Sequence, residues 1–269
     1  MNTHVKLAAT RTILLMLLLL SSGCGDKKKK RKPIKLVDHY TILPLDYAGD
    51  RPEISTIHEI EVDAERIELT REYLRLHNNE FYRYLPVANE ITSIRFQPQI
   101  VVVHYTSVPT LEEVIDTFTP NTIDGSRELI AKNGALNVGV QFVVDRDGTI
   151  YRLYPENVMS RHVIGLNHVA IGIENVGNAD LDNAETGDKL PLTQEQLVAN
   201  EKLIRYLGKN YSTLRYMIGH HEYRELEDRK HPAHHLFHED VVGYRTEKQD
   251  PGPAFMRALR KRLKTKTQK

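Results

Sequence analysis

Short apolar runs separated by polar turns predict the strands of this chain. Residues 100–103 are continuously apolar, which is typical of a strand buried on both faces. The segment 135–155 predicts a β-hairpin, because apolar residues flank the turn sequence Asp-Arg-Asp-Gly at 145–148. The predicted strands are 99–105, the two arms of this hairpin, 168–176 and a run from Leu214 to Gly219.

Helical periodicity and capping residues predict helices between these strands. Asp63 can cap one helix, and Thr193 with Gln196 forms the capping-box pattern of another. The predicted helices are 63–77, 111–118 with Thr110 as its cap, 193–208 ending at Gly208, and a last one beginning at Pro253. Strands that alternate with helices predict an α/β domain with the sheet at its centre. Segments 33–60 and 178–190 lack this periodicity and predict a linker and a surface loop.

The N-terminus has the pattern of a bacterial lipoprotein signal peptide. Lys6 and Arg11 precede an apolar run at 13–20, which is too short to span a bilayer. The single cysteine of the chain, Cys24, follows at the position where a lipoprotein is cleaved and lipidated. We therefore expect a lipid anchor on Cys24, and Gly25 favours the outer membrane and its periplasmic face. An ordinary secretory signal with an incidental cysteine is the alternative.

Charge is distributed unevenly along the chain. Residues 27–32 are all Lys or Arg, a run that should stay extended and solvated. It predicts either a tether that also contacts anionic lipid or a plain spacer. Eight of the 37 basic residues and one of the 36 acidic residues lie in 1–32, so the remainder has a net charge of −6. This acidic balance argues against a nucleic-acid-binding protein.

Two histidines and one aspartate combine into a candidate metal site. His104 ends the apolar run at 100–103, and His220 ends the run from Leu214. Asp250 precedes a Pro-Gly-Pro turn that restricts its backbone. Two imidazoles and one carboxylate are the ligands of catalytic zinc sites that leave a coordination position open for water.

Five sequence motifs occur in an order that resembles a known family. They are VVVHYT at 101–106, DRDGTIYRL at 145–153, IGIENVG at 171–177, IGHHEY at 218–223 and KQDPGPAF at 248–255. Together they resemble the zinc-dependent N-acetylmuramoyl-L-alanine amidases, which include phage amidase-type lysozymes, anhydromuropeptide amidases and peptidoglycan recognition proteins. The resemblance implies a mixed central β-sheet flanked by helices, in a single catalytic domain with an N-terminal extension. The implied division is a signal peptide at 1–24, a basic tether and linker at 25–62, a zinc amidase domain at 63–263 and a basic tail at 264–269.

The same resemblance implies the site residues and their roles. His104, His220 and Asp250 match the three ligands of Zn²⁺. His221 competes with His220, and the family uses the first histidine of such a pair. Glu174 matches the acid that exchanges protons with the attacking water and the leaving amine. Lys248 matches a residue that stabilises the oxyanion.

Substrate contacts are expected from four more residues. His162 matches a groove histidine of the family, and Arg161 can bind a carboxylate of the stem peptide. Gln141 stands where many relatives have a histidine, and it can donate a hydrogen bond but cannot titrate. Asn167 is a further candidate donor. Val140 occupies the position of a catalytic tyrosine of some phage members, which excludes that role here.

The expected activity is hydrolysis of the amide between N-acetylmuramic acid and L-alanine in peptidoglycan or muropeptides, by a monomer. A muropeptide-binding lipoprotein without catalysis is the alternative, and Gln141 is the main feature in its favour. A peptidase of the H-E-x-x-H type is excluded, because the chain lacks that pair. The segment between His220 and Asp250 is longer than in many relatives. We expect this segment to form one wall of the substrate groove. Its four histidines could form a second metal site, but a histidine-rich loop is more often solvent-exposed and free of metal; they are His231, His234, His235 and His238.

Overall fold

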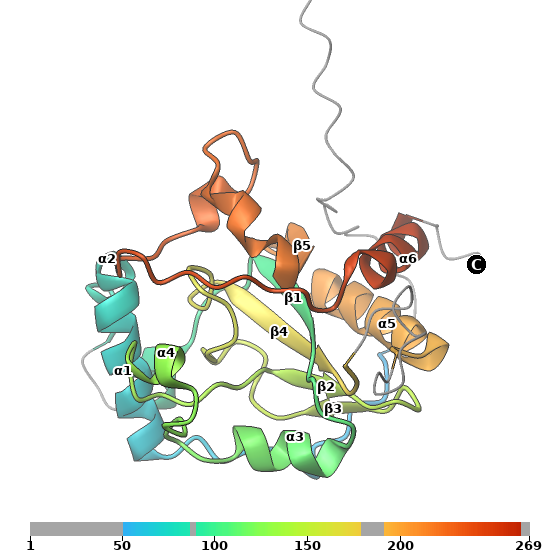
Figure 1. Ribbon diagram of the computed structural model, residues 1–269, viewed down its shortest axis with the longest axis horizontal. Coiled ribbons are helices and arrows are strands. Elements are labelled where there is room, and N and C mark those ends of the chain that lie inside the picture. The colour runs from blue at the N-terminus through green and yellow to red at the C-terminus, as the bar shows by residue number, and fades with distance from the viewer. Residues whose placement is uncertain (1–50, 87–89, 179–190, 265–269) are drawn as a thin grey trace, which may run out of the picture. The chain divides into compact units, whose positions relative to one another are not determined.

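A five-stranded sheet organises the chain in the order β3-β2-β4-β1-β5 (Figure 1). The computed structural model describes residues 51–86, 90–178 and 191–264. The predicted signal peptide, the lipidation site Cys24, the basic run and most of the terminal tail lie outside the described residues. The strands are β1 (Ile100–Tyr105), β2 (Phe142–Val144), β3 (Ile150–Arg152), β4 (Ala170–Asn175) and β5 (Tyr216–Gly219).

The sheet is mixed, as predicted. β1 lies between β4 and β5 and is parallel to both, whereas β2 is parallel to β4 and antiparallel to β3. The turn at 145–148 joins β2 to β3, which confirms the predicted hairpin. In the register of β1 with β4, His104 lies opposite Glu174. The parallel pairing thus places a candidate ligand and the candidate base side by side at the ends of adjacent strands.

Helices cover both faces of the sheet, and the alternation of side chains decides what each face buries. Val101 and Val103 face a core shared with α5 (Gln194–Asn210) and α6 (Pro253–Lys264), which lie close together in Figure 1. Ile100 and Val102 face the opposite way, toward a second core, and His104 follows them in the same alternation. The remaining helical segments are α1 (Ala64–His77), α2 (Asn79–Tyr82), α3 (Leu111–Phe118), α4 (Glu128–Ala131), and the short 3-10 helices η1 (Ile91–Ile94), η3 (His220–Glu227) and η4 (His234–Leu236).

The predicted helix caps are confirmed, with one boundary wrong. Asp63 accepts a hydrogen bond from the main-chain N–H of Arg66, and Thr193 with Gln196 forms a reciprocal capping box. The predicted end at Gly208 is two residues too early. Gly208 is buried within the helical backbone, and Tyr211 caps the helix by donating its N–H to the Leu207 oxygen.

The segment between His220 and Asp250 packs against the C-terminal end of α1. The His77 oxygen accepts from the Asp240 N–H at 3.0 Å, and the Asn78 amide donates to the His238 oxygen at 2.7 Å. His77 also pairs with Glu239 at 2.8 Å, with both side chains fully buried. These contacts hold the segment against the end of α1. Within the described part of the chain, no helix is both long and apolar enough to cross a membrane.

Candidate active site

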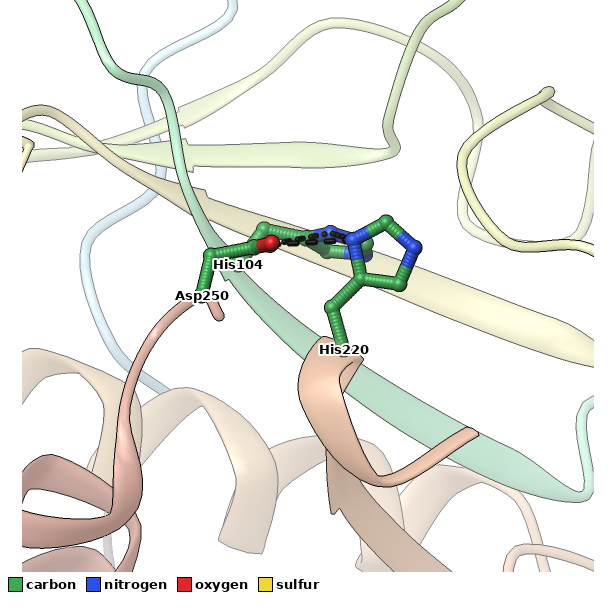
Figure 2. A group of neighbouring side chains, drawn as sticks. All are labelled: His104, His220 and Asp250. Carbon is green, nitrogen blue, oxygen red and sulfur yellow. Dashed lines mark hydrogen bonds and ion pairs between the residues drawn. The ribbon is translucent and has the colours of Figure 1, made fainter. Parts of the chain in front are cut away.

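Three side chains from distant parts of the sequence converge at the ends of the parallel strands (Figure 2). His104 comes from β1, His220 begins η3, and Asp250 lies just before α6. The Nδ1 atoms of the two histidines are 3.0 Å apart. The Asp250 Oδ2 atom lies 3.2 Å from Nδ1 of His104 and 3.0 Å from Nδ1 of His220. Two histidines and one carboxylate therefore present one donor atom each to a common point.

This donor set fits a zinc ion. At bond lengths near 2.1 Å, the ligands of a tetrahedral Zn²⁺ lie about 3.4 Å apart, a few tenths of an ångström more than the separations seen here. Burial lowers the pKa of His220 to about 4, which leaves its imidazole neutral and able to bind a metal. Burial opposes ionisation of Asp250, but His220 and His104 hold its pKa well below the usual value, so it remains a carboxylate. Among the described residues, this is the one cluster of three or more such side chains suited to a metal.

His220 reaches the cluster by a route different from the predicted one. β5 ends at Gly219, so His220 is the first residue of a 3-10 turn rather than the last residue of a strand. Glu222 stabilises this turn by accepting the Gly219 N–H at 2.7 Å, and Arg260 of α6 pairs with the Glu222 carboxylate at 2.6 Å. The ring of His221 is not part of the cluster and instead contacts the main-chain oxygen of Asp250, 3.1 Å from its Nδ1. The choice of His220 over its neighbour therefore agrees with the geometry.

His162 lies directly behind His104. Its Nδ1 atom is 3.1 Å from Nε2 of His104, the ring nitrogen opposite the one that faces the cluster. Burial, together with His104 and His220, lowers the pKa of His162 well below its usual value, so the ring is neutral. A hydrogen bond to the outer nitrogen of a ligand histidine fixes its orientation and tautomer. His162 is therefore placed to orient His104, a role that the sequence analysis did not predict. It also lines the cleft, where a contact with the substrate was expected.

Glu174 is a buried carboxylate with no hydrogen-bond partner among the described residues. Its exposure is 7%, and burial raises its pKa to about 7. His104, Lys248 and Arg127 oppose this rise, whereas Asp250 adds to it. A carboxylate that titrates near neutral pH can take a proton from water and later return it.

A cleft of about 620 Å³ contains the cluster and Glu174. Lys248 lines it and forms no hydrogen bond or ion pair with a described residue, so its ammonium group is available within the cleft. Val140 lines it as well, which agrees with the exclusion of a tyrosine role. Arg127, Tyr244 and Thr246 also line the cleft, and no sequence motif identified them.

Gln141 does not reach the cleft, and its predicted substrate contact is wrong. The side chain is fully buried, donates to the Val158 oxygen at 2.7 Å and accepts the Gly172 N–H at 2.7 Å. Both ends of the amide are therefore satisfied inside the protein. Gln141 ties β4 to the segment that follows β3.

Arg161 and Asn167 border the cleft, but internal contacts occupy their polar groups. The terminal nitrogens of Arg161 donate to the Gly134, Leu136, Ile130 and Asn133 oxygens at 2.7 to 3.0 Å. Asn167 accepts the His162 and Val163 N–H groups and donates to the Tyr73 hydroxyl. Both side chains thus have structural roles: Arg161 holds the 130–136 segment, and Asn167 holds the loop that carries His162. Their contacts with a substrate stay predictions.

The family model described as N-acetylmuramoyl-L-alanine amidase matches residues 95–253, which include every member of the cluster and Glu174. No curated protein sequence matches the chain.

Solved structures of similar proteins include amidases and recognition proteins. An endolysin amidase, LysCS from Clostridium intestinale URNW, is 30% identical over 49% of this chain and 74% of its own, with a TM-score of 0.35. AmpDh3 from Pseudomonas aeruginosa is 16% identical over 62% and 60%, with a TM-score of 0.40. The human recognition protein PGRP-IβC, solved with a glycosamyl muramyl pentapeptide, is 18% identical over 60% and 81%, with a TM-score of 0.38. At these TM-scores the sequence match, rather than the superposition, carries the assignment.

Proposed function

Because this chain belongs to the N-acetylmuramoyl-L-alanine amidase family, with a match over more than half of its length, we propose that it hydrolyses the amide between N-acetylmuramic acid and L-alanine in peptidoglycan or muropeptides. The observation that carries this proposal is the position of Glu174 beside the His104, His220 and Asp250 cluster in one cleft. The family match supports an amidase in general, and the cleft supports hydrolysis by this chain.

His104, His220 and Asp250 would hold Zn²⁺. When bound, zinc supplies a Lewis acid that polarises the substrate carbonyl and lowers the pKa of a coordinated water to about 7. The chain contributes two neutral imidazoles and one carboxylate, held in place by neighbouring contacts. His162 orients His104 through its outer ring nitrogen, and His221 holds the main chain of Asp250.

Glu174 acts as the general base and then the general acid. It takes a proton from the attacking water as the carbon–oxygen bond forms, and it returns that proton to the leaving nitrogen as the amide bond breaks. Its burial and its lack of a competing hydrogen bond suit this exchange, because each form of the carboxyl is accessible near neutral pH. Lys248 provides a positive charge in the same cleft for the oxyanion of the tetrahedral intermediate.

The alternative of a binding protein without catalysis loses its main support. That alternative rested on Gln141, which cannot titrate. The side chain is fully buried and does not line the cleft, which argues against a direct contact between Gln141 and a bound substrate. The cleft retains the three candidate ligands and both candidate catalytic side chains.

The decisive experiment is mass spectrometry of muropeptides incubated with residues 33–269. We expect free stem peptide to be released, release to stop with a chelator, and activity to return when zinc is added. Binding of muropeptide without any cleavage in the zinc-loaded protein would contradict the amidase and support the binding protein.

We also propose that Cys24 carries a lipid anchor, which would hold the enzyme at the periplasmic face of the envelope, in the outer membrane. The support is the sequence pattern of a basic region, a short apolar run and a cysteine. Replacement of Cys24 by Ala should move the protein from the membrane fraction to the soluble fraction. If the variant stays in the membrane fraction, an uncleaved signal segment is the better explanation.

A further inference from the structure

Lys248 lies on a stretch of chain that has no regular secondary structure. Residues 244–250 form neither helix nor strand, yet Thr246, Lys248 and Asp250 all line the cleft. Without the repeated main-chain hydrogen bonds of a helix or a sheet, such a stretch is positioned by the individual contacts that reach it. Asp250 has its own, because the main-chain N–H of His221 donates to its oxygen at 2.9 Å. On the other side of Lys248, the stretch is held at Thr246.

The Tyr223 hydroxyl forms two hydrogen bonds with the main chain of Thr246. It donates to the Thr246 oxygen at 2.6 Å and accepts the Thr246 N–H at 2.8 Å. One side chain therefore satisfies both main-chain groups of that residue. The Tyr223 ring is fully buried in the second core, and close packing around the ring makes its hydroxyl a fixed point.

Two ion pairs also join η3 to this stretch, and both are at least partly exposed. Arg224 pairs with Glu247 through side chains that are 45% and 83% exposed, and Arg245 pairs with Glu227 at 3.0 Å. Ion pairs at the surface contribute little to a fixed geometry, because water and salt screen the charges and the long side chains stay mobile. The buried tyrosine hydroxyl is therefore the dominant contact between η3 and this stretch.

We propose that Tyr223 is a positioning residue for the amidase reaction: its hydroxyl holds Thr246 so that Lys248 projects into the cleft. Tyr223 does not itself line the cleft, so it acts through the main chain and not by touching the substrate. Because η3 begins with His220, the same contact sets Lys248 relative to an element that carries a candidate metal ligand. This inference rests on the proposed function and on the role of Lys248 in it.

The test combines Tyr223→Phe with Lys248→Met in a double-mutant cycle on the zinc-loaded protein. Tyr223→Phe keeps the buried ring and loses both hydrogen bonds. We expect kcat for muropeptide hydrolysis to fall about tenfold with KM nearly unchanged, because the oxyanion exists only in the transition state. In the Lys248→Met background, the same substitution should change kcat by less than about twofold, since the group that it positions is absent.

Tyr216→Phe is the matched control. The Tyr216 hydroxyl also donates to a main-chain oxygen beyond η3, that of Pro232 at 3.3 Å. Pro232, unlike Thr246, does not line the cleft, so this variant should keep kcat within about twofold of wild type. The zinc content of both tyrosine variants should equal that of wild type, because Asp250 keeps its main-chain hydrogen bond to His221.

A second readout is independent of turnover. Lys248 is half-buried, and its rate of acetylation by limiting acetic anhydride reports how freely the side chain moves. Mass spectrometry would measure this rate against that of Lys132, which is exposed and serves as the internal reference. We expect the rate at Lys248 to rise about tenfold in Tyr223→Phe, the size of one lost hydrogen bond, and to stay at the wild-type value in Tyr216→Phe.

The outcomes separate this inference from the proposed function. If Tyr223→Phe lowers kcat equally with and without the Lys248 amine, or leaves the acetylation rate unchanged, then Tyr223 does not position Lys248. If the wild type hydrolyses no muropeptide, the amidase proposal fails, and the acetylation rates alone decide whether Tyr223 positions the lysine. Loss of zinc from Tyr223→Phe would show that the hydroxyl acts on the cluster instead, and would overturn the inference.

Discussion

His221 holds the main chain of Asp250 through two contacts to one oxygen. Its main-chain N–H donates to the Asp250 oxygen at 2.9 Å, and its Nδ1 lies 3.1 Å from the same atom. Its neighbour His220 meets the carboxylate of that same aspartate at 3.0 Å. The two consecutive histidines therefore have different roles. His220 is itself a candidate metal ligand, whereas His221 positions Asp250, another candidate ligand.

We predict that His221→Ala weakens zinc binding without abolishing it. Loss of the ring contact should cost about tenfold in affinity, at the lower end of the effect of removing a partner behind a ligand, because the main-chain hydrogen bond remains. Asp250→Ala, which removes a candidate ligand, should lose most of the bound zinc. Competition with a chromogenic chelator would measure both. His235→Ala is the control, since His235 is exposed, and a similar loss there would contradict the positioning role.

Glu174→Gln should retain zinc and lose turnover. The amide has nearly the same shape as the carboxyl group but cannot accept a proton from water, and removal of a general base costs about 10² to 10⁴ in kcat. Metal analysis and muropeptide hydrolysis on the same preparation would test this. Activity within a few-fold of wild type would assign the base to another residue.

The stability of the metal-free protein should report the burial of Glu174 independently of catalysis. Its pKa rises from 4.5 to about 7 on folding, so the folded state favours the protonated carboxyl. The contribution of the protonated Glu174 carboxyl to the free energy of unfolding is fully present below pH 4.5 and is lost as pH rises through 7. The free energy of unfolding of Glu174→Gln should therefore equal that of wild type near pH 4 and exceed it by up to about 3 kcal/mol at pH 8. Urea denaturation at the two pH values measures the difference.

A control for this measurement is Glu68→Gln, which removes an exposed carboxylate on α1. Its effect should stay within about 0.5 kcal/mol, as for most surface substitutions. A Glu174→Gln variant that is less stable than wild type at pH 8 would mean that the ionised carboxylate has a stabilising partner in solution.

Local signals in the sequence accounted for most of the fold. These signals act within a few residues, so each could be predicted without the tertiary structure: the apolar run at 100–103, the hairpin turn at 145–148 and the cap at Thr193. The end of α5 was harder to predict, because Gly208 is held in the helix by burial rather than by its own propensity. The motif order also placed the three candidate ligands, which converge in space.

The roles of polar side chains around the cleft could not be predicted from the sequence in the same way. Gln141 stands where many relatives have a histidine, and Arg161 precedes the matched groove residue His162, which favours substrate contact. Each nevertheless bonds to main-chain groups inside the protein. Arg127 shows the reverse: it lies in an unremarkable polar segment and still lines the cleft. Whether a polar side chain faces the cleft depends on contacts across the fold, which sequence spacing does not specify.

Gly172→Ala should disturb the candidate metal ligands indirectly, through His162. A Cβ atom at Gly172 would lie 2.9 Å from Cγ1 of Val140, closer than Cβ atoms normally approach, and 3.0 Å from the His162 ring, which would have to shift by a few tenths of an ångström. Because His162 contacts the outer nitrogen of His104, displacement of its ring should weaken zinc binding as well as stability, the latter by about 1–3 kcal/mol. Gly125→Ala is a matched control, since a Cβ there meets no atom within 4 Å. Thermal unfolding and zinc affinity, measured on both variants, test the relationship. If Gly172→Ala loses stability but binds zinc as tightly as Gly125→Ala does, His162 does not position His104, and the contact between the two rings has no role in holding the metal.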